Sequence, residues 1–151
     1  MAEFALRQGT WVAVCDGRKA LLFENEGDHA YPNLRMIETR AQDNPATHEQ
    51  GSAPPGRTFS AAGGRHAAVQ DTDFHDEAER HFLKDFAALL DRRVRAEPGH
   101  DLILVAPARA LGMIRPVLSA AARAVLVAEL DRDYVKMPSF EIEKRLKEMH
   151  R

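Results

Sequence analysis

Two neighbouring stretches, Thr10-Trp-Val-Ala-Val-Cys-Asp-Gly17 and Lys19-Ala-Leu-Leu-Phe-Glu24, decide the fold that we predict for this chain. Residues 10–15 form an apolar run rich in β-branched and aromatic side chains, which is typical of a strand buried on both faces. The Asp-Gly pair that follows indicates a turn. Because the connection to the second run is short, we expect the two strands to form an antiparallel hairpin.

A third strand and a long loop follow the hairpin. Leu34 to Arg40 alternates loosely between apolar and polar residues, as an edge strand does. Gln42 to Asp73 keeps no period of either kind and is rich in proline and glycine. Irregular segments of this length in small domains are usually functional or disordered, so we predict a loop over about 42–73.

The second half of the chain alternates helices with strands. Apolar residues recur every four positions from Phe74 to Leu90, which predicts a long amphipathic helix. Pro116 should kink or restart the helical stretch that opens at Pro107. The remaining predicted elements are strands at Leu102–Ala106 and Val125–Leu130, and a last helix from Ser139, as N-cap, to Met149, with Ile142, Leu146 and Met149 facing inward.

This order of elements predicts the arrangement of the sheet. Right-handed crossovers place strand four beside strand one, and strand five beyond it. The result is a single α/β domain over residues 1–151, with a five-stranded mixed sheet of order 3-2-1-4-5 in which strand 2 is antiparallel. We therefore predict a three-layer, ribonuclease-H-like fold with helices on both faces.

Strand direction then predicts where a ligand would bind. Strands one, three, four and five should point the same way, so their carboxyl ends share one edge of the sheet. That edge would carry Asp16, the long loop, Arg109, Asp131 and Asp133. Ligands of open α/β sheets favour this edge, at the point where the strand order reverses.

Composition narrows the class of protein. The chain has 151 residues, of which 44% are hydrophobic and 29% charged, with a formal net charge of -2. Nucleic-acid binding would therefore need a local basic patch. Cys15 is the single cysteine, so no internal disulfide forms, and its apolar context favours a buried, inert thiol. No stretch approaches the roughly 20 apolar residues of a membrane span, and no signal-peptide pattern opens the chain, so we expect a cytoplasmic protein without membrane insertion.

The best candidate for a ligand site is the glycine- and arginine-containing part of the loop. Gly63-Gly64 can leave backbone N–H groups open to an anion. Guanidinium groups suit phosphate, and the basic residues that could converge there are Arg57, Arg65, His66 and Arg109. This pattern favours a phosphate or RNA site. In the alternative interpretation the arginines pair with acidic residues and pin the loop, the candidates being Asp16, Asp71, Asp73 and Asp131.

Catalytic and cofactor chemistry finds less support in the sequence. Asp16 and Asp131 could form a metal pair of the nuclease kind, but strand four ends without an acid, and Asp16 is also an ordinary turn residue. His75 and Glu79 share a helix face without further ligands, so we predict no metal. The chain shows no phosphate-loop or dinucleotide-binding glycine pattern and no nucleophile elbow. We therefore expect no cofactor and favour a protein without catalysis.

Five short motifs in order resemble one known family, the bacterial host attachment proteins, over about residues 10–146. The motifs are Trp11-Val-Ala-Val-Cys-Asp-Gly17, Gly56-Arg57-Thr58-Phe59 with Gly63-Gly64-Arg65-His66-Ala67, Glu79-Arg80-His81-Phe82, Leu104-Val-Ala-Pro-Ala-Arg-Ala-Leu-Gly112 and Val127-Ala-Glu-Leu-Asp-Arg-Asp133. That family is similar to the central domain of archaeal and eukaryotic class I translation release factors, which carries a Gly-Gly-Gln motif in a long loop before a long helix.

This resemblance implies where the site lies and what it lacks. Gly63-Gly64 occupies the place of the two glycines, but Arg65 stands where the catalytic glutamine would be. Our leading hypothesis is a binding domain that associates with RNA or the ribosome through Gly63–His66. One alternative is a protein-interaction factor indirectly needed for host-cell attachment, as the family name suggests. Another is a hydrolase or nuclease that uses the same edge of the sheet.

Overall fold

A five-stranded mixed sheet forms the centre of the computed structural model, which describes residues 4–42 and 64–149. The strands are β1 (Trp11–Cys15), β2 (Lys19–Asn25), β3 (Leu34–Ala41), β4 (Leu102–Ala106) and β5 (Leu126–Asp131). Their order is β3-β2-β1-β4-β5. β2 is antiparallel to both β1 and β3, while β4 is parallel to both β1 and β5. The predicted sheet order and strand directions are confirmed.

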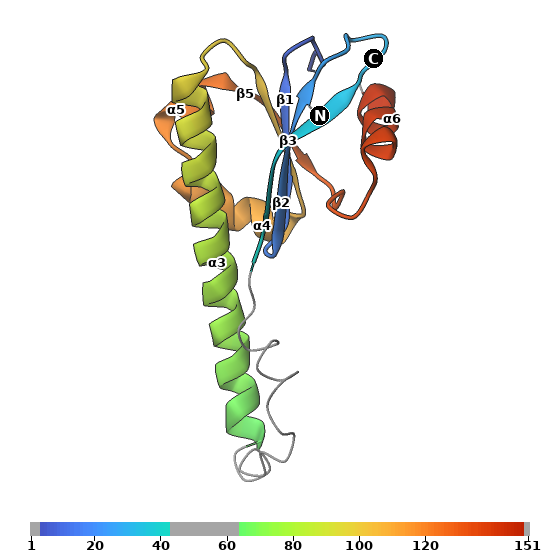
Figure 1. Ribbon diagram of the computed structural model, residues 1–151. Helices are drawn as coiled ribbons and strands as arrows, with labels where there is room; N and C mark the ends of the chain where they lie inside the picture. Colours follow the sequence, from blue (N-terminus) through green and yellow to red (C-terminus); the bar gives the residue numbers. More distant parts are fainter. Residues whose placement is uncertain (1–3, 43–63, 150–151) are drawn as a thin grey trace.

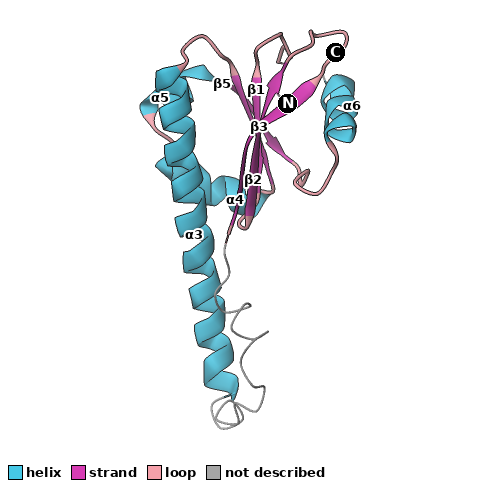
Figure 2. Ribbon diagram, viewed as in Figure 1, coloured by secondary structure: helices cyan, strands magenta, loops and turns pink. Residues whose placement is uncertain are grey.

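Helices cover both faces of this sheet (Figures 1 and 2). The α-helices within the described ranges are α3 (Gly64–Ala96), α4 (Ala108–Ile114), α5 (Ala120–Val125) and α6 (Ser139–Met149), and a short 3-10 helix spans Arg115–Val117. Helices α3, α4 and α5 lie on one face and α6 on the other. The fold is therefore the three-layer, ribonuclease-H-like arrangement that the sequence predicts.

The two central strands explain why the sheet is stable between these layers. Every residue of β1 and β4 is buried, as a strand covered on both faces requires. Alternate side chains enter opposite cores: Trp11 and Ala13 face α3, whereas Val12 and Val14 face the α6 side. The continuous apolar run therefore serves two cores at once.

Helix α3 begins at Gly64 and not near Phe74, so residues 64–73 of the predicted loop are helical. Residues 65–96 contain no proline and no glycine, so nothing in the backbone interrupts the helix once it has begun. The amphipathic period starts only where the helix meets the sheet. Figure 1 shows the first part of α3 extending past the edge of the sheet, where no core imposes such a period.

Two smaller predictions needed correction, whereas the predicted restart of the helical stretch at Pro116 is confirmed. Val125 ends α5 and does not start the fifth strand, which begins at Leu126. Pro116 lies in the 3-10 turn, and the chain restarts as α5 after Ser119, whose hydroxyl oxygen accepts a hydrogen bond from the Ala122 N–H at 3.1 Å. Ser139 is the first residue of α6 and not its N-cap, because the carbonyl of the preceding proline accepts the first helical bond. The inward positions are confirmed, being Ile142, Leu146 and, partly buried, Met149.

Candidate functional site

The carboxyl ends of the parallel strands meet at one edge of the sheet, as predicted. A hollow of about 270 Å³ opens there between the ends of β1 and β4. Its wall comes from four regions that are far apart in the sequence. The residues around it are Asp16, Gly17, Arg18, Glu79, Pro107, Arg109, Ala110 and Asp133. The hollow therefore lies at the point where the connections diverge, which is the common ligand position in open α/β sheets.

Arg109 dominates the electrostatics of this hollow. Its Nε donates a hydrogen bond to Glu79 Oε1 at 3.1 Å, and its Nη2 donates to Asp76 Oδ1. The hydrogen bond to Glu79, followed by the one to Asp76, raises the pKa of the Arg109 guanidinium. Both acceptors belong to α3. The guanidinium is thus already paired with carboxylates, although not with those named in the alternative interpretation of the arginines.

Asp16 serves the turn between β1 and β2. Its Oδ1 accepts hydrogen bonds from the backbone N–H groups of Arg18 and Lys19, each at 2.8 Å. Asp131 lies at the exposed end of β5. Within residues 4–42 and 64–149, no three histidine, cysteine or acidic residues come together as metal ligands. These contacts of Asp16 are the ones expected of an ordinary turn residue, which was the alternative to a metal pair with Asp131.

A close approach between α3 and this turn was not foreseen from the sequence. A Cβ atom added to Gly17 would lie 2.7 Å from both Cγ and Cδ of Glu79 and 3.0 Å from its Cβ. Glycine is therefore required at residue 17 by packing, and its φ angle is not positive. The Asp-Gly pair signalled a turn, but no local pattern could reveal that a helix lies against it.

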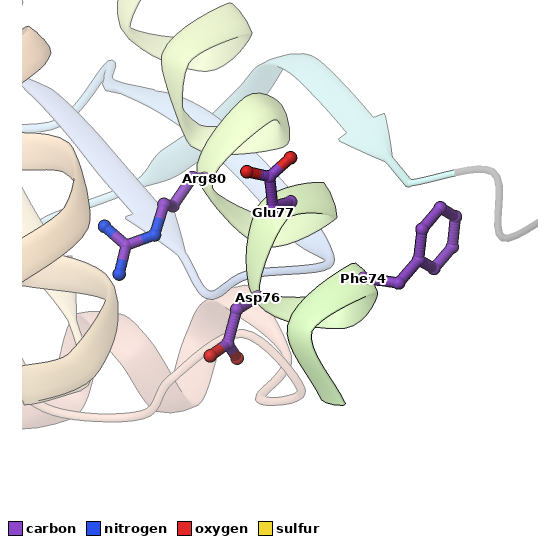
Figure 3. Close-up of a pocket in the computed structure, with 4 residues that line it drawn as sticks. All are labelled: Phe74, Asp76, Glu77 and Arg80. Carbon is purple, nitrogen blue, oxygen red and sulfur yellow. The ribbon is translucent and has the colours of Figure 1, made fainter. Parts of the chain in front are cut away.

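Beyond this contact, α3 leaves the body of the domain. Phe82 is its first buried residue among the side chains described from Phe74 onward. Phe74 is 53% exposed and, with Asp76, Glu77 and Arg80, borders a second, open hollow of about 520 Å³. Figure 3 shows the side chain of Phe74 pointing away from those of Asp76 and Arg80. Among the side chains of α3 described before Phe82, the charged groups of Asp76, Glu77 and Arg80 thus lie beside the exposed ring of Phe74.

The predicted binding residues fall into two groups. Arg57 and Gly63 lie outside the described residues, as do the side chains of Arg65 and His66, whereas Gly64 is the first residue of α3. A helix rises 1.5 Å per residue, so position 65 lies about 16 Å along the axis from Asp76, the partner of Arg109. Arg109 is therefore near the sheet, and the start of α3 is at the far end of the projection (Figure 1).

These features define a class of protein: a ribonuclease-H-like α/β domain with a glycine at the start of a long helix that precedes β4. The model of bacterial archaeo-eukaryotic release factor family 12 matches residues 9–146, and the chain belongs to this family. No curated protein matches the chain. The family match confirms the release-factor part of the predicted resemblance, and the host-attachment part stays a prediction.

A membrane-spanning helix must be both long and apolar throughout, and the described helices differ from that pattern. None of those within residues 4–42 and 64–149 is both long enough and apolar enough to cross a bilayer.

Proposed function

We propose that this domain associates with RNA or the ribosome through the segment Gly63–His66, as a release-factor-like binding protein. The observation that carries the proposal is the geometry of α3. This helix begins at Gly64, and about 18 Å of it lies between that residue and Asp76, which contacts Arg109 at the edge of the sheet. A glycine pair at that end of α3 would reach a partner that the sheet itself cannot approach.

The start of α3 also suits an anionic partner. The first backbone N–H groups of a helix have no helical acceptors and carry partial positive charge, which favours phosphate. The first turn of α3 contains no acidic residue, and Arg65 and His66 fall within it. A basic first turn is unfavourable for the isolated helix, so it is better explained by an anion that binds there.

We propose binding without peptide release. Membership of the family supports a translation-related partner, but Arg65 replaces the glutamine that the resemblance would require for catalysis. Arg109 would contribute less than Arg65, because two carboxylates already bind its guanidinium and hold it at the edge of the sheet, away from Gly64.

Ribosome co-sedimentation and filter binding to RNA, at about 50 and 200 mM salt, test this proposal. The Arg65→Ala variant should bind more weakly, and the slope of log affinity against log salt should fall by about one. The matched control is Arg145→Ala, which removes the same charge from α6, where Arg145 pairs with Glu141 at 3.0 Å. That control should bind like the wild type.

Two results would contradict the proposal. If Arg65→Ala and the wild type co-sediment equally at low salt, the start of α3 is not the contact. If the wild type releases peptide from peptidyl-tRNA on ribosomes, the domain is a catalyst despite Arg65. Loss of a protein complex without any change in ribosome binding would instead favour the role in host-cell attachment.

A further inference from the structure

A third hollow, a groove, lies on the other side of the sheet, away from α3. It has a volume of about 390 Å³ and lies between the outer strands β2 and β3 and the chain that leads into α6. The side chains of Leu21, Phe23 and Leu34 provide a buried apolar floor. Met36 and Met137 also line this groove, and Met36 is 47% exposed in the middle of an edge strand.

The rim of the groove is positively charged. Lys19 and Lys136 line it, and none of its described lining residues is acidic. The chain as a whole has a net charge of -2 and contains five lysines. Besides the two that line the groove, Lys144 and Lys147 lie on the adjacent α6. Only Lys84 belongs to the opposite face, on α3. Lysine is therefore concentrated around one apolar groove on an acidic protein.

Two acidic residues of the adjacent α6 already have partners. Glu141 pairs with Arg145, and Glu143 Oε2 accepts a hydrogen bond from the Leu34 N–H at 2.7 Å. Next to the groove-lining Ser139, Phe140 is 68% exposed, which extends the apolar surface along α6. Exposed apolar surface rimmed by charge is typical of a protein-binding site.

We propose that this groove binds an acidic peptide segment of a partner protein, with an apolar side chain seated on Leu21, Phe23 and Met36 and carboxylates paired with Lys19 and Lys136. Flexible methionine side chains suit an apolar insert of varied shape. A nucleic acid is less well matched, because Phe23, the aromatic side chain among the described lining residues, is 2% exposed and offers no open ring for base stacking. This inference is independent of the start of α3, so both surfaces could be occupied at once.

Methionine methyl groups report directly on the groove. In the protein labelled with ¹³C-methyl methionine, Met36 and Met137 line the groove, whereas Met113 packs on the α3 side and serves as an internal control. The probe is a pool of decapeptides built from Asp, Glu, Leu, Phe and Ser, compared with a pool in which Lys and Arg replace the acids. The acidic pool should shift the Met36 and Met137 signals saturably and leave Met113 unchanged, and the basic pool should have no effect.

Charge reversal tests the lysines. The Lys19→Glu/Lys136→Glu variant should bind the acidic pool at least about tenfold more weakly, whereas Lys84→Glu should bind it normally. Both groove lysines are exposed, so the variants should unfold at the wild-type temperature, and the milder Lys19→Gln/Lys136→Gln pair should show a smaller loss.

Several outcomes would overturn the proposal. These are the absence of any shift with the acidic pool at millimolar concentration, or equal shifts with the basic pool. Stronger shifts with oligouridine would make the groove a nucleic-acid surface. Shifts of Met36 that depend on protein concentration alone would make it a contact between two copies of the chain.

Discussion

The side chain of Glu79 lies directly against Gly17, so that the turn after β1 and the long helix α3 touch where a Cβ atom could not fit. The same carboxylate accepts a hydrogen bond from Arg109. One glutamate therefore fixes three parts of the domain relative to one another: the turn, the helix and the start of α4.

Adding a methyl group at residue 17 should disturb this contact. Gly17→Ala should lower the free energy of unfolding by about 1–3 kcal/mol, because Cγ, Cδ and Cβ of Glu79 would all have to move. Urea denaturation measures this change. In the Gly17→Ala/Glu79→Ala double variant the loss should be less than the sum of the two single losses, since two of the three crowded atoms are gone.

Gly112 offers the matched control for this substitution. It lies inside α4, and nothing lies within 4 Å of the Cβ position there. Gly112→Ala should therefore stabilise the domain by about 0.5–1 kcal/mol through helix propensity. Equal effects at the two glycines would show that the contact with Glu79 is not constraining.

The ion pairs of Arg109 give two predictions, one for the stability of the domain and one for its affinity for RNA. The guanidinium is 59% exposed and its ion pairs are screened by solvent, so Arg109→Ala should change the free energy of unfolding only slightly. Asp76→Asn should leave the guanidinium partly free and remove a negative charge, so RNA affinity should rise about twofold to fivefold. Filter binding measures this rise.

An exposed carboxylate further along α3 controls for net charge alone. Asp85→Asn makes the same charge change at a residue that lies 3.5 Å from His81 and is 69% exposed. If Asp85→Asn raises RNA affinity as much as Asp76→Asn does, the release of Arg109 plays no part.

Asn25 is a buried polar residue whose hydrogen bonds join the N-terminal segment to the connection between β2 and β3. Its Nδ2 donates to the carbonyls of Leu6 and Arg7, and its Oδ1 accepts from the N–H groups of Gly27 and Asn33 at 3.0 and 2.8 Å. Asn25→Ala should lower the free energy of unfolding by about 2–4 kcal/mol, since these buried groups would lose their partner.

The control is Asn33→Ala, which keeps the backbone N–H that Asn25 binds. It should change the stability by no more than about 0.5 kcal/mol. Asn25→Asp retains the acceptor but turns the donor into an anion facing carbonyl oxygens, so wild-type stability in that variant would contradict this role for Asn25.

Cys15 should be unreactive in the folded protein. Burial, and then the neighbouring Asp16 charge, raises the pKa of its thiol from 9.0 to about 12. At pH 9 only about one thiol in a thousand would be ionised in the native state, against about half in the unfolded chain. Iodoacetamide should therefore modify the native protein slowly at pH 9 and the urea-unfolded protein rapidly. Fast, stoichiometric modification of the native protein would contradict the burial of Cys15.

The sheet was predictable because its signals are local. Continuous apolar runs mark β1 and β4 as central strands, and the handedness of crossovers then determines the order of the rest. The first part of α3 was not predictable in the same way. Residues 64–73 precede the contact with the sheet, so they carry no apolar period, and the proline- and glycine-rich segment before them made a loop the natural interpretation.

The candidate site was only partly predictable, for a different reason. Strand direction placed Arg109 at the carboxyl edge of the sheet, where the structure has a hollow. The partners of Arg109 could not be chosen from the sequence, because Asp76 and Glu79 are distant along the chain and compete with other acids on the same edge. The contact of Gly17 with Glu79 was missed because packing between two elements leaves no pattern in either one.

The projecting part of α3 has a mechanical consequence. The helix contacts the turn and Arg109 near one point, around Asp76 and Glu79, and continues for about 18 Å to Gly64. The contact at the edge of the sheet is therefore the pivot about which this part of the helix would tilt. A tilt of about 10° at the pivot would carry Gly64 through about 3 Å, which equals the length of a hydrogen bond. The ion pairs of Arg109 with Asp76 and Glu79 would thus help to set the direction of this part of the helix, and a change of charge at Arg109 would displace Gly64.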